Sequence, residues 1–231
     1  MAPLELMLFW ILTLGAAGFF AFTASRRIAT LRAGLPDDRF DQPWVRLKGV
    51  LLYAFVQKRM VRDPYAGLYH LLIFWGFCVL SLRSVDLVLG GLFPHFSLVE
   101  LLGGAGLAYS FMKDVFEVLV LAGIALAMLR RALFKPWRLE NSLDAWGTLS
   151  FIAVLMATDL LADGALIARD APAWATWSPA SRLVAGWFAG HNLDQLTNLY
   201  KVNWWLHLAA LYGFANFLPY SKHFHVFTSL F

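Results

Sequence analysis

The stretch that decides the interpretation of this chain is WWLHLAALYGFANFLPYSKHFHVFTSLF, residues 204–231. His207 and His225 lie 18 residues apart in it, which is five full turns of an α-helix and predicts two side chains on one face. At a rise of about 1.5 Å per residue they stand about 27 Å apart, close to the thickness of the hydrocarbon core of a bilayer. His223 falls on nearly the opposite face, and Pro219 is expected to kink the helix. The pattern predicts a membrane helix with a histidine near each surface, as for axial ligands of haem stacked across a bilayer.

The composition agrees with a membrane protein. Hydrophobic residues make up 60% of the 231 residues, and charged residues make up 15%. This length leaves room for about five spanning helices in one domain, residues 1–231. A single cysteine, Cys78, excludes a disulfide framework and a cysteine-ligated iron–sulfur cluster within the chain. We therefore expect an all-α integral membrane bundle, and no nucleic-acid partner.

Five apolar segments predict transmembrane helices. They cover residues 4–22, 65–92, 108–129, 144–167 and 203–231. The first segment lacks a basic start and a convincing cleavage site, so we expect a retained helix and not a signal peptide. Between the second and third segments, residues 93–107 predict a loop with a short surface helix.

An amphipathic segment precedes the second span. Residues 44–62 intersperse apolar side chains with Arg46, Lys48, Lys58 and Arg59. This pattern predicts a helix that lies in the membrane interface with its cations over lipid phosphates. Docking of a soluble partner is the alternative interpretation.

The distribution of positive charge indicates the orientation. Of 19 Lys and Arg residues, nine lie between the first and second spans, four between the third and fourth, and one after the fifth. These loops are expected on the cytoplasmic side of a cell inner (cytoplasmic) membrane, with the N-terminus outside and the C-terminus inside. In this multi-pass arrangement His70, near the start of the second span, and His225 lie at similar depth.

Two histidines at matched depth indicate a haem site. A low-spin b-type haem needs two imidazoles that face each other from different helices. Gly67 and Gly76 flank His70 and leave room for a macrocycle. The alternative is that His70 and His225 are ordinary residues of the membrane interface.

Charged residues inside the spans have two interpretations. Arg83 and Asp86 are three residues apart, and Lys113 and Glu117 are four apart, so each pair can neutralise itself on one helix. Alternatively, Arg83 binds a haem propionate or a quinone, since intramembrane charge is costly and usually functional. A transporter pathway lined by such charges is a further alternative, although the chain has no inverted repeat.

Two motifs carry a resemblance to known families. The first is H-x11-P-[YF]-S-[KR]-x2-H, which begins at His207 and ends at His225, and it resembles the final helix of the gamma (cytochrome b) subunit of respiratory nitrate reductase. The second, DPYAGLYHLLIFWGF at residues 63–77, resembles the membrane cytochrome of heterodisulfide reductases. It is also similar to the membrane domain of related iron–sulfur oxidoreductases that pass electrons between electron-transfer flavoprotein and menaquinone.

The resemblance implies a haem-b subunit or domain of a quinone-linked oxidoreductase. Its partners would be menaquinone or ubiquinone and an iron–sulfur protein, or a fused iron–sulfur domain, on the cytoplasmic side. By the same resemblance, His70 and His225 bind the haem nearer the cytoplasm, and His207 binds a second, distal haem. A haemless membrane scaffold and a transporter-like bundle are the alternatives.

The distal site departs from the resemblance. The position of its other ligand is occupied by Leu80, which cannot bind iron. A second haem therefore needs a different sixth ligand, for which His95 and His191 are candidates, or an open coordination position on His207.

Overall fold

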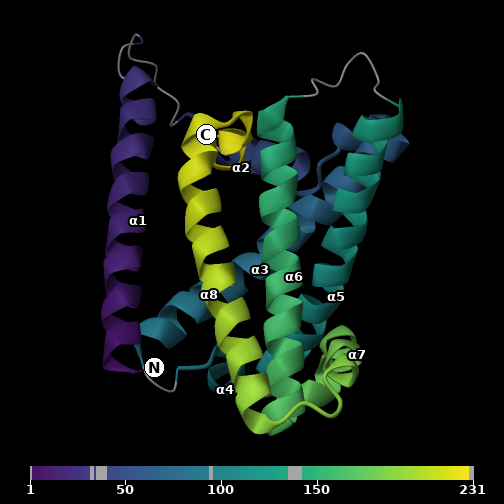
Figure 1. The fold of residues 1–231 in the computed structure, drawn as a ribbon. Helices are drawn as coiled ribbons and strands as arrows, with labels where there is room; N and C mark the ends of the chain where they lie inside the picture. The colour runs from purple at the N-terminus through teal and green to yellow at the C-terminus, as the bar shows by residue number, and fades with distance from the viewer. Residues whose placement is uncertain (1, 32–33, 35–40, 94–95, 135–141, 229–231) are drawn as a thin grey trace. The chain divides into compact units, whose positions relative to one another are not determined.

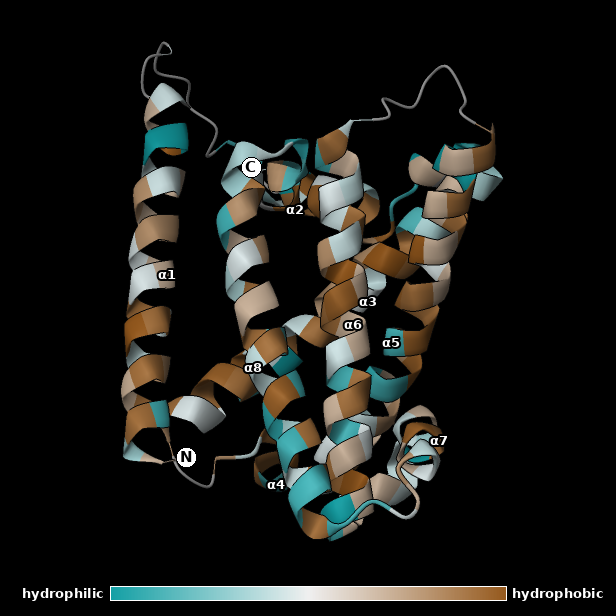
Figure 2. Cartoon of the chain, in the orientation of Figure 1, coloured by the Kyte–Doolittle hydropathy of each residue, from teal (hydrophilic) through white to brown (hydrophobic). Residues whose placement is uncertain are grey.

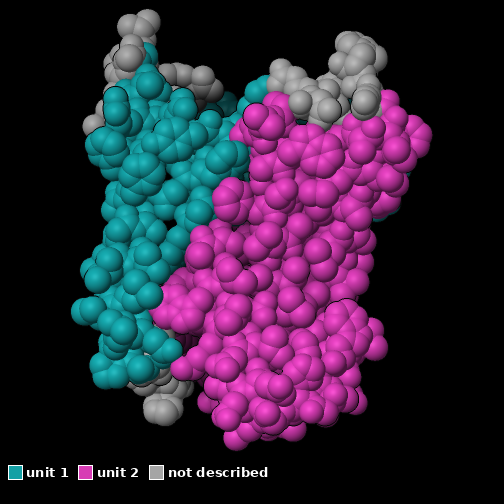
Figure 3. Space-filling view, viewed as in Figure 1, with its two compact units in different colours: residues 1–71, 212–231 teal, residues 72–211 magenta. Residues whose placement is uncertain are grey.

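The chain is described by a computed structural model that covers residues 2–31, 34, 41–93, 96–134 and 142–228. Every regular element in these residues is helical, which confirms the all-α prediction. The chain divides into two compact units (Figure 3): unit 1 comprises Met1–Leu71 and Tyr212–Phe231, and unit 2 comprises Leu72–Leu211. The expectation of a single domain stays a prediction.

Within the described part of the chain, three helices are long and apolar enough to cross a membrane, namely α1 (Pro3–Leu31), α3 (Pro64–Leu92) and α6 (Leu143–Asp170). The other two predicted spans correspond to α5 (Gly104–Leu129) and α8 (Leu193–Phe217), which carry more polar residues. The five-span layout and its orientation therefore stay predictions.

In unit 1, α1 packs against the C-terminal segment through polar contacts. The hydroxyls of Thr13 and Tyr212 lie 2.7 Å apart. Nδ2 of Asn216 donates a hydrogen bond of 3.2 Å to the carbonyl of Ala16. The rings of Phe19 and Tyr220 stack with centroids 6.4 Å apart. These contacts use one side of α1, and its other apolar side chains are largely exposed, as on a helix that faces lipid.

The C-terminal segment differs most from the sequence prediction. Helix α8 ends at Phe217, and 3-10 turns at Leu218–Tyr220 and Lys222–Phe224 lead to the short helix α9 (His225–Thr228). The prediction of one continuous helix from His207 to His225 is therefore wrong. The physical reason is Pro219, which has no N–H to donate and whose ring crowds the preceding turn. The sequence predicted a kink at this proline, whereas in the structure the helix ends just before it.

The predicted interfacial helix at residues 44–62 is also shorter than expected. Helix α2 (Pro43–Val50) continues as a π-helical turn, Leu51–Phe55, and ends there. A 3-10 turn, Met60–Arg62, follows. No residue of α2 is buried, and Trp44 is 79% exposed. The exposed apolar side chains agree with an interfacial helix, a role that stays a prediction.

Unit 2 contains the short helix expected in the loop at residues 93–107. This helix is α4 (Leu98–Leu102), and it begins where the hydroxyl of Ser97 accepts a hydrogen bond from the N–H of Glu100. It packs on α5, which continues as a π-helical turn, Arg130–Phe134. The prediction of a short helix here is confirmed.

Helix α7 (Pro179–Trp187) covers α5 and α6 within unit 2 (Figure 1) and follows a 3-10 turn, Ala173–Trp177. Its N-terminus is held by the buried carboxylate of Asp114 on α5. Asp114 accepts hydrogen bonds from the backbone N–H groups of Ala180 (2.6 Å) and Ser181 (2.8 Å), and from the Ser181 hydroxyl (2.6 Å). The negative charge also suits the positive end of the helix dipole.

Two glycines allow helices of unit 2 to approach closely. A Cβ at Gly76 on α3 would lie 2.0 Å from Cγ2 of Val120 on α5. A Cβ at Gly106 on α5 would lie 2.1 Å from the carbonyl oxygen of Val99 on α4. Gly76 is therefore needed for helix packing, a role different from the space for a macrocycle that the sequence predicted.

The Gly106 contact predicts a specific loss of stability. Gly106→Ala should lower Tm and cost about 1–3 kcal/mol, because the new methyl group meets backbone that cannot rotate away. Gly104→Ala, two residues earlier on α5, is the matched control, since a Cβ there meets nothing within 4 Å. The control should stay within about 1 kcal/mol of the parent. Equal Tm values for both variants in thermal unfolding would contradict the close approach of α4 and α5.

Candidate functional site

The histidine group of unit 1 consists of His70, His223, His225 and Gln57. Nδ1 of His70 lies 3.1 Å from Oε1 of Gln57, and Nδ1 of His225 lies 3.1 Å from the carbonyl oxygen of Lys222. His225 and His223 are both close enough to His70 for their charges to interact with it. The ligand role predicted for His70 and His225 stays a prediction.

In both His70 and His225, one ring nitrogen, Nδ1, is already engaged in a hydrogen bond. An amide or carbonyl oxygen accepts hydrogen bonds, so Nδ1 of each ring is the nitrogen that carries the proton. Nε2 then carries the lone pair, and it has no hydrogen-bond partner among the residues that the structure describes. Histidines that bind metal ions usually have this arrangement, in which the second nitrogen donates to an oxygen.

Gln57 holds the ring of His70 from an unusual backbone position. Its φ is 52°, in the left-handed region that costs non-glycine residues about 1–3 kcal/mol. It is nonetheless only 4% exposed, and its carbonyl accepts a hydrogen bond of 2.9 Å from the N–H of Met60. The sequence analysis missed Gln57 because it assigned residues 44–62 to one regular helix. No motif in the sequence marks it.

His223 lies beside His225, with ring centroids 6.1 Å apart. The sequence analysis placed His223 on the opposite face of a helix and gave it no cofactor role. His223 instead lies within the last 3-10 turn, Lys222–Phe224, and His225 begins α9 directly after it.

The second feature is a buried ion network in unit 2. It joins side chains from three helices: Arg83 and Asp86 of α3, Lys113 and Glu117 of α5, and Asp159 and Asp163 of α6. Hydrophilic positions interrupt the mostly hydrophobic ribbons of α5, α6 and α8 in the part of unit 2 nearer α7 (Figure 2). The sequence indicated the pairs within one helix but not the contacts between helices.

Arg83 connects α3 to α6. Its Nε donates to Asp159 Oδ1 at 3.0 Å, and its Nη1 donates to Asp86 Oδ2 at 3.1 Å. Its Nη2 forms a longer ion pair of 3.7 Å with Asp163 Oδ1. The predicted pairing of Arg83 with Asp86 is confirmed. The alternative role, binding of a haem propionate or quinone, stays a prediction.

Lys113 connects α5 to α6. Its Nζ lies 2.7 Å from Glu117 Oε1, 3.0 Å from Asp159 Oδ2 and 3.0 Å from Asp163 Oδ2. The three N–H groups of an ammonium match three acceptors, which is the condition for burying it. The predicted pairing of Lys113 with Glu117 is confirmed.

His207 is buried beside this network and is 4% exposed. Its Nδ1 lies 3.0 Å from the carbonyl oxygen of Leu155 and 3.2 Å from the hydroxyl of Thr158, both on α6. In His207, as in His70 and His225, Nδ1 is the ring nitrogen that is hydrogen-bonded. The distal ligand role of His207 stays a prediction.

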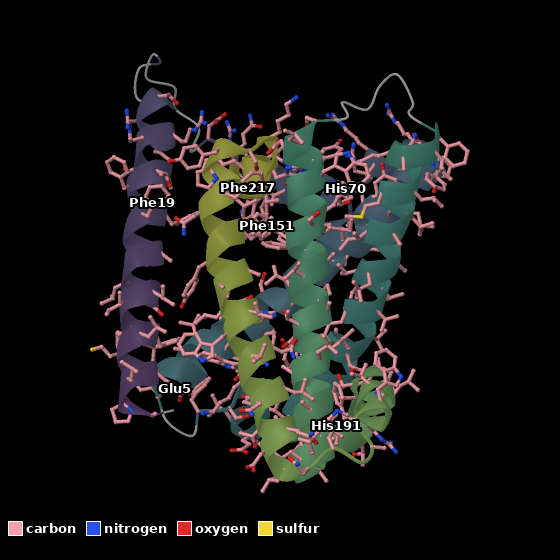
Figure 4. All side chains as sticks on the ribbon, viewed as in Figure 1. Glu5, Phe19, His70, Phe151, His191 and Phe217 are labelled. Atoms are coloured by element: carbon pink, nitrogen blue, oxygen red, sulfur yellow. The ribbon has the colours of Figure 1, made fainter. Side chains whose placement is uncertain are left out.

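One candidate sixth ligand of the distal site, His191, is not brought to His207. His191 is exposed near α7, where its ring meets the carbonyl of Phe188 (Figure 4). His95 lies outside the described residues. Among the described residues, no group of three or more His, Cys, Asp or Glu side chains is arranged to hold a metal ion. A haem with two axial histidines does not need such a group.

Comparison with known proteins finds distant relatives that are named as oxidoreductases. The "Probable iron-sulfur-binding oxidoreductase FadF" of Bacillus subtilis is 29% identical over 221 residues, which cover 95% of this chain and 31% of that protein. The "EtfAB:quinone oxidoreductase" of Syntrophomonas wolfei is 28% identical over 242 aligned positions, which cover 99% of this chain and 33% of that protein. The chain thus spans about a third of the length of these relatives. No family model and no solved structure matches the chain.

The ion network predicts a large effect of removing one cation. Arg83→Met should lower the free energy of unfolding by about 3–5 kcal/mol, because buried carboxylates lose their partner. Arg182→Met, an exposed arginine on α7, is the matched control and should change it by less than about 0.5 kcal/mol. Denaturant titration of both variants in detergent measures the difference. Equal stability of the two variants would mean that the network does not hold the helices together.

Proposed function

We propose that this chain is the haem-b electron-transfer part of a quinone-linked membrane oxidoreductase, with His70 and His225 as the axial ligands of one haem. The observation that carries the proposal is the arrangement of the histidine group. His70 and His225 belong to the same unit, and each has Nδ1 bonded to an oxygen and Nε2 available. The similarity to an iron–sulfur-binding oxidoreductase and to a quinone oxidoreductase supports the same proposal.

The residues of the histidine group fit a haem b. When bound, this group supplies one-electron redox chemistry. The chain supplies the two imidazoles and keeps them in the correct tautomer, since Gln57 and the Lys222 carbonyl each hold a proton on Nδ1. Each acceptor also fixes the rotation of its ring. The proposal rests on this one haem, and a second haem on His207 stays a prediction.

The proposed setting is a five-span bundle in the inner membrane. The C-terminal end of α1, helix α2 and the C-terminal segment lie at the same end of unit 1 (Figure 1), so the basic residues of these segments gather there. By the positive-inside rule this end is cytoplasmic. The N-terminus of α1 lies at the opposite end of unit 1. This arrangement supports an external N-terminus and a cytoplasmic C-terminus.

The proposed partners follow from the relatives and from this orientation. One relative is named as a quinone oxidoreductase and the other as an iron–sulfur-binding oxidoreductase. We infer that electrons pass between menaquinone or ubiquinone in the membrane and an iron–sulfur protein or domain on the cytoplasmic side. Lys58 and Arg59, which precede α3 and its His70, are the proposed docking residues. The Arg59 guanidinium lies 4.6 Å from the ring centroid of Tyr53, which limits its freedom.

The haem is tested by absorbance. A dithionite-reduced minus oxidised spectrum of the purified protein should contain the sharp alpha band of b-type haem. His70→Ala and His225→Ala should remove the band, whereas the exposed control His191→Ala should keep it. A haemless scaffold or a transporter-like bundle gives no band in any of these proteins. Unchanged haem content in both ligand variants would refute the assignment of His70 and His225.

The hydrogen bond from His70 to Gln57 gives a second test. Gln57→Leu removes the acceptor and makes the imidazole a weaker electron donor, so the haem midpoint potential should rise. Haem affinity should fall by about 10–100-fold. Gln195→Leu, an exposed glutamine near the start of α8, is the matched control and should change neither quantity. Redox titration and haem titration measure the two effects, and an unchanged potential in Gln57→Leu would remove Gln57 from the site.

A further inference from the structure

The ion network contains more acids than bases. Four carboxyl groups, from Asp86, Glu117, Asp159 and Asp163, surround two cations, Lys113 and Arg83. If all four were ionised, two negative charges would remain uncompensated inside a low-dielectric bundle. Such burial is strongly unfavourable, so a network of this kind is expected to hold at least one proton.

The hydrogen bonds indicate which carboxyl group carries this proton. Both oxygens of Asp159 accept from cations, and Asp163 has one cation near each oxygen. Asp86 accepts from Arg83 on one oxygen and from the backbone N–H of Leu98, at 2.7 Å, on the other.

Glu117 is different. Its Oε1 binds Lys113, but its Oε2 is buried and has no hydrogen-bond partner among the described residues. The side chain as a whole is 0% exposed. Ionised Glu117 would therefore leave an acceptor unsatisfied, whereas a protonated Oε2 becomes a donor.

The carboxyl group of Asp159 is the candidate acceptor for that donor. Glu117 and Asp159 bind the same ammonium nitrogen of Lys113, at 2.7 Å and 3.0 Å, so their carboxyl groups are neighbours. When two carboxyl groups lie next to each other in a buried site, they commonly share one proton, because the shared proton removes the repulsion between two negative charges.

The other titratable groups around the network have their own partners. The hydroxyl of Tyr109 on α5 donates to the carbonyl of Val79 at 3.3 Å. His207 on α8 bonds to Leu155 and Thr158, and none of its hydrogen bonds involves Glu117. The ring of Tyr200 on α8 lies 5.3 Å from the guanidinium of Arg169. Among the carboxyl groups of the network, Glu117 is therefore the one whose hydrogen-bonding contacts indicate a bound proton.

We propose that Glu117 is a buried proton-binding site, in which Oε2 carries a proton shared with Asp159 and exchanges it when the protein is reduced or oxidised. Binding of the proton leaves one uncompensated negative charge in the network instead of two. The exchange rests on the proposed function, because quinone chemistry moves protons together with electrons. The resting proton itself depends only on the contacts of unit 2.

Infrared spectroscopy of the full chain in detergent tests the resting proton. The protein should show the C=O stretch of a protonated carboxyl group, shifted in D2O, and Glu117→Gln should lose this band. Glu100→Gln, the same change at an exposed position on α4, should keep it. Because glutamine has the shape of neutral glutamate, Glu117→Gln should also keep the Tm of the parent. Absence of the band, its persistence in Glu117→Gln, or a lowered Tm of that variant would overturn the proposal.

A second variant and a redox difference spectrum complete the test. Glu117→Asp should move the carboxyl band without removing it. The band should change when a quinol analogue such as duroquinol reduces the protein, and a band that stays constant would overturn the proposed exchange. Failure of the proposed function has a separate signature, which is the absence of the b-type haem spectrum while the resting carboxyl band is present.

Discussion

The structure of unit 2 depends on two buried cations that each bind carboxyl groups of more than one helix. Arg83 joins α3 to α6, and Lys113 joins α5 to α6, so Asp159 receives both. Buried ion pairs contribute little net stability when compared with apolar packing, but each partner becomes costly to lose once the other is present. Such contacts are also directional. They fix the rotation and the axial position of three helices that otherwise present similar apolar surfaces to one another.

The histidine group of unit 1 is held in a different way. Its acceptors are a side-chain amide and a backbone carbonyl, and they come from the irregular segments at Gln57 and Lys222. Irregular backbone leaves polar groups free that a continuous helix would use internally. The ends of 3-10 and π-helical turns can therefore orient imidazole rings where the interior of a helix cannot. The left-handed φ of Gln57 is locally unfavourable, which agrees with a residue whose role is the hydrogen bond to His70.

Much of the fold was predictable because it follows from local physics. The apolar lengths defined α3 and α6 to within a few residues, and the spacing of Arg83 to Asp86 and of Lys113 to Glu117 defined the pairs within helices. Two kinds of feature were not predictable. The effect of Pro219 depends on whether neighbouring groups donate hydrogen bonds to the freed carbonyls, so the same proline can produce a kink or a helix end. The contacts of Asp159 and Gln57 depend on how helices and turns meet, which spacing along the chain does not encode.

The bond between Asp114 and α7 has a consequence for the order of folding. Helix α7 has nine residues, too few to persist alone in water or in a disordered chain. Its start is fixed by a carboxylate 66 residues earlier in the sequence. Helix α7 can therefore form stably only after α5 is in place, so it should be among the last parts of unit 2 to fold. During synthesis, the apolar face of α5 and α6 under α7 stays uncovered until the chain has grown past Trp187.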